Sequence, residues 1–221
     1  VICRENSKAL YQDYANEFIF ANPATGLADS FFMHGLDPNK LLQEKLQGRR
    51  DLLVGDVSIF GPRRIGAPPF TCCTAEFNIG DLRVKPEYVK LGKPSVSSYD
   101  YVFHIRDRKL REDDNWSLSK WEVLKELLQS DNIACIGTKP ASGWIEGTRD
   151  LRDMPLSEVC DVLRNAKCTF GPSSGPMHLS SLCGCPHVVW GDPSKSLGRY
   201  EKNWNPLNTP SLFVGEHLYH P

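Results

Sequence analysis

A run of small and turn-forming residues, FGPSSGP at 170–176, separates a β-prone run from an apolar, helix-prone run. Gly171 and Gly175 let the backbone approach a ligand closely, and Ser173 and Ser174 offer hydroxyls. The second proline suits the first position of a helix, where its missing N–H costs nothing. The helix's free N–H groups and positive dipole end would then face an anion, most plausibly phosphate. The same pattern also fits an ordinary capped helix start.

A histidine and two arginines could complete this anion site. His178 lies in the first turn of the predicted helix and could face either the anion or the core. The run HIRDR places His104, Arg106 and Arg108 after another apolar run. Arginines beside a helix N-terminus form a pocket for a dianion such as a diphosphate. The alternative is a solvated loop in which these arginines pair with the acidic residues that follow them, Asp107, Glu112, Asp113 and Asp114.

The elements that must position these residues alternate regularly after residue 100. The predicted strands cover 101–106, 132–137, 167–171 and 186–191, and the predicted helices cover 118–129, 157–166 and 175–184. Strands and helices in alternation predict an α/β domain with a parallel sheet and crossover helices. Ligands bind such sheets beyond the carboxyl ends of the strands, where HIRDR, Thr138 with Lys139, and the 171–175 loop would all lie.

The helix predicted over 118–129 has an apolar face, and Ser119 with Glu122 matches a capping box. The face consists of Leu118, Trp121, Leu124, Leu127 and Leu128.

The first half of the chain is less regular. Its start predicts a strand over 1–3 and then a helix up to residue 20, and the apolar run 51–60 predicts another strand. The segment 61–98 is rich in Gly, Pro, Cys and Ser and predicts loops and a linker. We therefore expect two domains, a partial Rossmann-like domain over 1–95 and a second Rossmann-like domain over 96–221.

Composition excludes several classes of protein. The 221 residues are 40% hydrophobic with a net charge of −1, as in soluble globular proteins without a nucleic-acid or membrane surface. No apolar run is long enough to span a membrane, and the start lacks the pattern of a signal peptide. The first residue is Val, which suggests processing or a fragment. Cys135, Cys160 and Cys168 stand in apolar runs, so we expect reduced, structural thiols and a cytoplasmic protein.

Three common site motifs do not fit the chain. The loop does not match GxxxxGK[ST], which excludes a P-loop, and no GxGxxG follows a first strand, which argues against a dinucleotide oxidoreductase. The sequence GPSSG has the spacing of the GxSxG elbow of serine hydrolases, but Pro172 does not suit that elbow and no order of acid and histidine completes a triad, which argues against a hydrolase.

The segment from Asp153 to Gly191, DMPLSEVCDVLRNAKCTFGPSSGPMHLSSLCGCPHVVWG, resembles the carboxyl-terminal half of glycosyltransferase family 9 proteins. These are relatives of the heptosyltransferases and have the two-domain GT-B fold. Asn115-Trp116, Trp121 and the later run NWNP at 203–206 carry the resemblance further. It covers about residues 100–206, is diffuse over 1–60 and is absent between.

The resemblance implies a nucleotide-diphosphate-sugar donor bound by the second domain and a glycan or lipid-linked acceptor bound by the first. It assigns Ser173, Ser174, Gly175 and His178 to the diphosphate, Thr138 and Lys139 to the base and ribose, Met154 to the nucleotide, and Arg106 and Arg108, with His104 on the same strand, to the phosphates. Helix N–H groups and positive charge would stabilise the departing nucleotide diphosphate, so no metal or other cofactor is expected.

The sequence also departs from this family. Heptosyltransferases carry an acidic residue and a threonine where this chain has Ser173-Ser174, and a lysine where it has Asp114-Asn115. HIRDR also resembles the His-x-Arg-Arg element of GT-B fucosyltransferases, so a GDP-fucose-like donor stays open. The amino-terminal half lacks a match to the strand that carries the family's catalytic base, so no catalytic residue is assigned. A GT-B-like protein that binds a nucleotide sugar without transferring it is the alternative.

Overall fold

The computed structural model describes residues 2–3, 8, 19–20, 77–79, 82–84, 90–109, 112–193, 200 and 205–215. The chain divides into two compact units, which are considered separately. One comprises Val1–Thr71 and Ala75–Lys85, and the other comprises Cys72–Thr74 and Pro86–Pro221. The expected domain boundary at residue 95 stays a prediction.

In the first unit, the described residues form two short pairs of strands. β1 (Ile2–Cys3) pairs in parallel with β2 (Ile19–Phe20), and β3 (Phe77–Ile79) pairs antiparallel with β4 (Leu82–Val84). The predicted strand at the start is confirmed. The helix predicted up to residue 20 is wrong at its end, because Ile19 and Phe20, a β-branched and an aromatic residue, extend beside β1.

The β3–β4 hairpin also corrects the expectation of loops throughout 61–98, because two three-residue strands interrupt that segment. The body of the predicted helix and the predicted strand over 51–60 lie outside the described residues. A Rossmann-like fold for the first half therefore stays a prediction.

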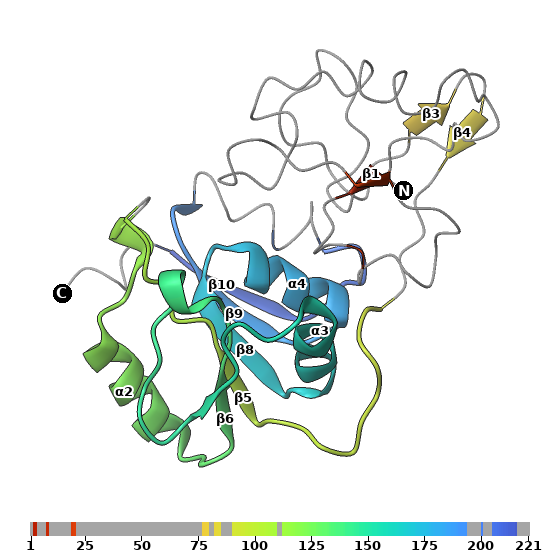
Figure 1. The fold of residues 1–221 in the computed structure, drawn as a ribbon. Helices are drawn as coiled ribbons and strands as arrows, with labels where there is room; N and C mark the ends of the chain where they lie inside the picture. Colours follow the sequence, from red (N-terminus) through yellow and green to blue (C-terminus); the bar gives the residue numbers. More distant parts are fainter. Residues whose placement is uncertain are drawn as a thin grey trace. The chain divides into compact units, whose positions relative to one another are not determined.

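The second unit contains a six-stranded sheet in which every strand is parallel to its neighbours (Figure 1). The strand order is β10-β9-β8-β5-β6-β7. The strands are β5 (Tyr101–Phe103), β6 (Ile133–Cys135), β7 (Arg149–Asp150), β8 (Cys168–Pro172), β9 (His187–Trp190) and β10 (Ser211–Val214). The predicted parallel α/β domain is confirmed.

Helices cover both faces of this sheet. They are α2 (Leu118–Leu128), α3 (Leu156–Asn165) and α4 (Gly175–Cys183), with the 3-10 turns η3 (Glu112–Asp114) and η4 (Lys139–Ala141). On β9, Trp190 packs in one cluster with Trp121 of α2, whereas its neighbour Val189 packs with Met177 of α4. Successive residues of a strand point to opposite faces, so α2 and α4 cover opposite sides. α3 lies beside α4 (Figure 1).

An aromatic cluster forms the core between the sheet and α2. Trp121 is fully buried and lies 5.1 Å from Phe103 and 5.2 Å from Trp190, measured between ring centroids. Trp116 stacks on Trp190 with centroids 4.1 Å apart and planes 17° apart. Burying such large rings is a major source of stability, and it fixes α2 and the segment before it on the sheet.

Two details of α2 differ from the sequence prediction. The helix begins one residue after Ser117, whose side chain makes no capping bond, so Ser119 is not its cap. Leu118 and Leu127 are 49% and 75% exposed, because the sheet contacts only the stripe of Trp121, Leu124 and Leu128. The buried face is thus narrower than the predicted one.

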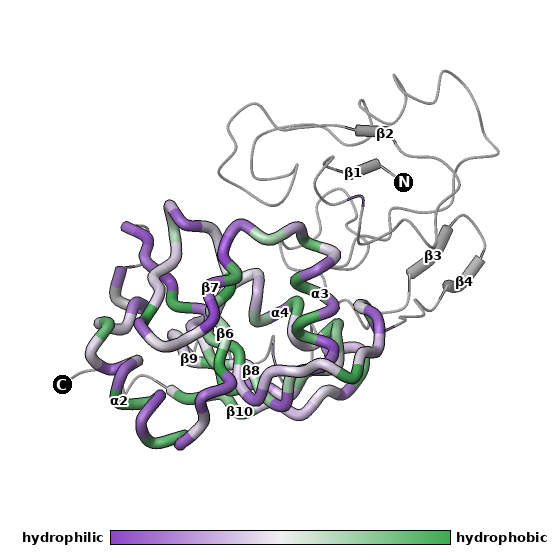
Figure 2. The backbone as a smooth tube through the Cα atoms, turned by 60° about the horizontal axis from the view of Figure 1, so that its bottom comes forward, coloured by the Kyte–Doolittle hydropathy of each residue, from purple (hydrophilic) through white to green (hydrophobic). Residues whose placement is uncertain are grey.

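Hydropathy separates the central strands from one edge strand. Figure 2 shows hydrophobic colour along β6 and hydrophilic colour at β7. Both residues of β7 are exposed, so this strand lacks the apolar run that made the central strands predictable.

Five described cysteines are free thiols, and all but the half-buried Cys168 are buried, in agreement with the expected structural role.

Candidate functional site at the carboxyl edge of the sheet

The strand order reverses direction between β5 and β8. After β5 the chain proceeds to β6 and β7 on one side, and after β8 it proceeds to β9 and β10 on the other. The backbone N–H of His104, the first residue after β5, still donates to the carbonyl of Phe170 on β8 at 2.9 Å. In open α/β sheets ligands bind at such a switch point, beyond the carboxyl ends of the strands. The predicted site residues His104 and Ser173 follow these two strands directly.

The loop between β8 and α4 leaves helix donors without acceptors. Ser174 is the N-cap of α4, but its side chain makes no capping bond, and its buried Oγ atom has no hydrogen-bond partner among the described residues. The N–H of His178 donates to the Ser174 carbonyl at 3.2 Å. Within the described part of the chain, the N–H groups of Gly175 and Met177 have no acceptor. An anion placed before the helix would satisfy both.

Two glycines in this region play different roles. A Cβ atom on Gly171 would lie 2.8 Å from Met177 Sδ and 3.2 Å from both Cβ and the carbonyl oxygen of His104. Gly171 is therefore needed for the close approach of α4 and β5 to β8. A Cβ atom on Gly175 would have no atom within 4 Å. The space where a Gly175 side chain would lie is therefore open.

His178 lies in the first turn of α4, as predicted. Its half-buried ring stacks on Tyr200, with ring centroids 4.2 Å apart and planes 8° apart. This stack fixes the plane of the imidazole next to the loop. Its contact with a diphosphate stays a prediction.

Arg106 is buried and forms an ion pair with Asp114. Its Nη1 atom lies 3.3 Å from Asp114 Oδ2, and the two side chains are 6% and 14% exposed. The Asp114 carbonyl also accepts a hydrogen bond from Trp190 Nε1 at 3.3 Å. Arg106 thus pairs with one of the acidic residues that follow it, as in the alternative interpretation of the sequence, but this pair is largely buried and not solvated. Asp114 anchors η3 over the ends of β5 and β9.

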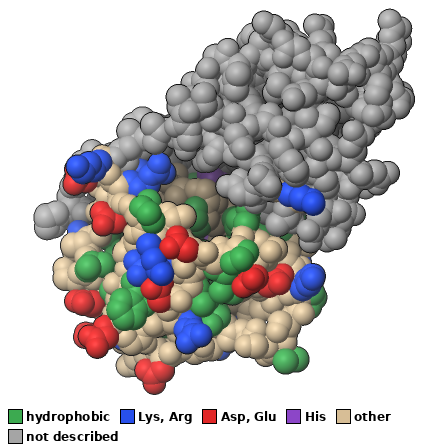
Figure 3. Space-filling model, in the orientation of Figure 1, with side chains coloured by type: hydrophobic (Ala, Val, Ile, Leu, Met, Phe, Trp, Pro, Cys, Tyr) green, Lys and Arg blue, Asp and Glu red, His purple; other side chains and the backbone are tan. Residues whose placement is uncertain are grey.

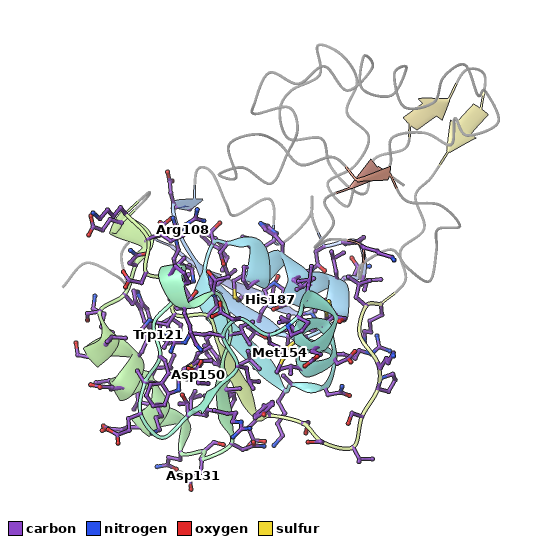
Figure 4. All side chains as sticks on the ribbon, viewed as in Figure 1. Arg108, Trp121, Asp131, Asp150, Met154 and His187 are labelled. Atoms are coloured by element: carbon purple, nitrogen blue, oxygen red, sulfur yellow. The ribbon has the colours of Figure 1, made fainter. Side chains whose placement is uncertain are left out.

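Arg108 differs from Arg106 in being exposed. Among the described residues its side chain has no ion-pair partner, and its carbonyl accepts a hydrogen bond from Asn115 Nδ2 at 2.8 Å. Figure 4 shows Arg108 and Asp131 at opposite ends of the domain. Asp131 precedes β6, so Arg108 lies at the carboxyl edge of the sheet, where the arginine was predicted. Its positive charge is open to solvent.

His104 is an uncharged, buried side chain. It is 6% exposed, and its Nδ1 atom lies 3.4 Å from the carbonyl oxygen of Ile136, which makes Nδ1 the protonated nitrogen. Burial lowers the pKa of His104 to about 4, the bond to Ile136 opposes this shift, and the charges of Arg106 and Arg108 reinforce it. His104 therefore adds no positive charge to the site at neutral pH.

The buried state of His104 predicts a loss of stability in mild acid. Between pH 6.5 and about 4 the unfolded chain binds a proton that the folded chain does not, so the free energy of unfolding decreases as the pH falls. The loss is about 2 to 4 kcal/mol and is complete below the folded pKa. Burial lowers the pKa of His187 too, which adds a loss of the same sign.

Urea unfolding at pH 7.5, 5.5 and 4 would measure this loss, and NMR titration of the His104 ring would identify its source. A His104 pKa near 6.5 in the folded protein would contradict the prediction. So would an unchanged pH dependence in His104→Gln.

The loops after β6 and β7 bring together the other residues that were predicted to bind the sugar-nucleotide donor. The N–H of Lys139 donates to Asp153 Oδ1 at 3.1 Å, and the N–H of Asp153 donates to the Gly137 carbonyl at 2.8 Å. Thr138 and Lys139 are exposed, and Met154, next to Asp153, is half-buried. Thr138, Lys139 and Met154 thus lie around one small backbone network at the carboxyl edge. Their contact with a base or ribose stays a prediction.

Sequence reasoning missed one residue of this site altogether. Tyr200 is fully buried, and its hydroxyl oxygen accepts a hydrogen bond from the Ser174 N–H at 3.0 Å. Tyr200 lies 26 positions from Ser174, so no local spacing links the two. The only available signal was an aromatic residue in the polar stretch after β9.

Acidic and basic side chains are intermixed over the described part of the face in Figure 3. No group of three or more His, Cys, Asp or Glu side chains in the described residues could hold a metal ion. A search of the same residues for a membrane-spanning helix finds none with the required length and apolar character.

Comparison with known proteins gives matches at the level of fold. No protein-family model matches the chain, and no curated protein matches its sequence. Parts of solved glycosyltransferase structures do match. The glycosyltransferase family 9 protein from Veillonella parvula DSM 2008 shares 13% identity over 56% of this chain and 37% of its own, with a TM-score of 0.44.

Two heptosyltransferases match in a similar way. ADP-heptose lps heptosyltransferase II of E. coli shares 16% identity over 53% of this chain and 39% of its own, with a TM-score of 0.41. The dodecameric iron-containing heptosyltransferase TibC, solved in complex with ADP-D-beta-D-heptose, shares 18% identity over 64% of this chain and 38% of its own, with a TM-score of 0.43. This chain therefore spans well under half the length of the proteins it matches. The Veillonella parvula protein is named as a member of glycosyltransferase family 9, the family that the Asp153–Gly191 segment resembles.

Proposed function

We propose that the chain binds the diphosphate of a nucleotide-diphosphate sugar at the β8–α4 loop and belongs to a glycosyltransferase that transfers the sugar to a hydroxyl acceptor. The observation that carries this proposal is the uncapped start of α4 at the switch point of the sheet. There, among the described residues, the N–H groups of Gly175 and Met177 have no acceptor, and the space where a Gly175 side chain would lie is open. The family 9-like motif from Asp153 to Gly191 spans this same loop.

The surrounding charges support an anionic ligand. Arg108 brings an exposed guanidinium to the carboxyl edge, and Arg106 brings a second that Asp114 partly neutralises. The start of α4 adds the positive end of the helix dipole. His178 is the third side chain, after Arg108 and Arg106, that is a candidate for contact with the diphosphate, because its ring lies one turn into α4.

These groups suggest how transfer would be assisted. When the bond between the sugar and the diphosphate breaks, negative charge accumulates on the departing nucleotide diphosphate. Fixed N–H donors and a guanidinium stabilise that charge more than the charge of the bound donor, which lowers the barrier. In this scheme they provide the positive charge without a metal ion. The acceptor would also lose its proton to a base, and no residue is assigned to that role.

Calorimetric titration with ADP, GDP and UDP, each beside its nucleoside, tests the proposal. We expect at least one diphosphate to bind at least about tenfold more tightly than its nucleoside, because charged hydrogen bonds contribute about 1.5 to 3 kcal/mol each. His178→Ala should weaken diphosphate binding, and Lys167→Ala, which changes a charged side chain at the other end of β8, should not. If none of the three diphosphates binds, the proposed function is wrong.

A nucleotide-sugar-binding protein without transferase activity is the second candidate. It is favoured by the absence of any assigned catalytic base. Incubation of the protein with the sugar nucleotide of the preferred base and a panel of glycan acceptors separates the two. Release of nucleoside diphosphate that depends on the acceptor identifies a transferase, whereas tight binding with no release identifies a binding protein.

A further inference from the structure

Tyr200 connects the β8–α4 loop to the body of the second unit. Its side chain is fully buried and packs with Met177 of α4 and Val189 of β9. Ser211 Oγ, at the start of β10, donates to the Tyr200 carbonyl at 3.3 Å. The ring is thus held by helix and sheet together, and the residue is a rigid support for whatever its hydroxyl contacts.

The hydroxyl of Tyr200 contacts the loop at three atoms. It accepts from the Ser174 N–H at 3.0 Å, and it lies 3.4 Å from both Ser173 Oγ and the Ser174 carbonyl oxygen, to either of which it can donate. A buried phenol needs such partners, and a buried loop amide needs an acceptor. The pairing therefore fixes the backbone at Ser174, the residue that begins α4.

This pairing decides which loop donors can reach a ligand. The Ser174 N–H is occupied by Tyr200, and the Ser173 N–H by the Trp190 carbonyl at 2.6 Å. The N–H groups of Gly175 and Met177 remain for an anion. The ring of Tyr200 also stacks on His178 at 4.2 Å, which holds the imidazole next to the same donors.

We infer that Tyr200 is a positioning residue for the diphosphate, acting through Ser174 and His178 without touching the ligand; this inference rests on the proposed function. The hydroxyl orients the loop backbone, and the ring orients the imidazole. The two contributions are separable, because phenylalanine keeps the ring and loses the hydroxyl.

The test compares Tyr200→Phe with Tyr101→Phe, which makes the same chemical change on β5, where the ring packs 5.8 Å from Phe170. Two quantities are measured. The first is the hydrogen-exchange rate of the Ser174 amide by NMR, without ligand. The second is affinity for the preferred nucleoside diphosphate and for its nucleoside. A merely structural role would change the affinities for the diphosphate and for the nucleoside alike. Positioning of the N–H groups that bind phosphate would change only the affinity for the diphosphate.

In Tyr200→Phe we expect the Ser174 amide to exchange at least about fivefold faster and diphosphate affinity to fall about 5- to 12-fold, as for loss of one neutral hydrogen bond, with nucleoside affinity unchanged. Tyr101→Phe should match the wild-type protein in the Ser174 exchange rate and in the affinities for both the diphosphate and the nucleoside. Unchanged Ser174 exchange, or an equal loss of both affinities, overturns the inference. If the wild-type protein binds no diphosphate but Ser174 exchange still depends on the hydroxyl, the loop pairing stands, and the proposed function and the ligand-positioning role both fail.

Discussion

Replacing Arg106 with alanine is expected to lower the free energy of unfolding by about 3 to 5 kcal/mol, the cost of removing one partner of a buried ion pair. Asp114 is only 14% exposed, and without Arg106 its carboxylate would stay in that site with its charged partner gone. Asp114 also holds the indole of Trp190 through its carbonyl, so the strain would extend to the aromatic core. Urea unfolding of the variant and the wild-type protein measures the loss.

The double variant Arg106→Met with Asp114→Leu is the control for this prediction. Replacing both charges with apolar side chains of similar size should recover most of the stability, because the loss in the single variant comes from an unpaired charge. A double variant as unstable as the single one, or a single variant that loses less than about 1 kcal/mol, would contradict the ion-pair account.

The same ion pair complicates the test of Arg106 as a phosphate ligand. Where Arg106→Ala still folds, diphosphate binding should weaken by about 1.5 to 3 kcal/mol, as for one charged hydrogen bond. Asp114→Asn separates the two roles, because it keeps the guanidinium and removes the anion that competes with phosphate for it. That variant should bind the diphosphate at least as tightly as the wild-type protein.

Placing a carboxylate at the start of α4 should abolish most of the binding without harming the fold. In Gly175→Asp the new side chain enters open space, and an acidic residue in the first turn is favourable for the helix. A diphosphate at the same place would be repelled by about 2 to 3 kcal/mol, or about 30- to 150-fold in affinity.

Gly175→Asn is the matched control, with the same shape and no charge. Its affinity should stay within about threefold of wild type, and thermal unfolding should show both variants folded. Equal affinities for the aspartate and asparagine variants would place the diphosphate elsewhere.

The central elements of the second unit could be predicted because they are buried on both faces. Strands β5, β6, β8 and β9 are apolar runs, and turn residues separate them from the helices. β7 was missed because its two residues, Arg149 and Asp150, are exposed and charged. β10 was missed because a strand of four residues at the sheet edge, with Leu212 61% exposed, has no buried periodicity.

The site could be predicted to the extent that it is local in sequence. The Ser173–Gly175 loop, the start of α4 and the place of His178 follow from residues next to one another. The pairing of Arg106 with Asp114 was one of two predicted alternatives, and the sequence could not choose it because tertiary packing brings the two side chains together. A contact of Arg106 with phosphate stays a prediction. The contact of Tyr200 with Ser174 arises from tertiary packing, which neither spacing nor composition encodes.

Amide NMR of the labelled wild-type protein tests the central claim most directly, namely that the N–H groups at the start of α4 bind the diphosphate. Spectra are recorded during titration with the preferred nucleoside diphosphate and, separately, with its nucleoside. The account predicts that the Gly175 and Met177 amide resonances shift most with the diphosphate and little with the nucleoside. Diphosphate binding that leaves both resonances in place would contradict it.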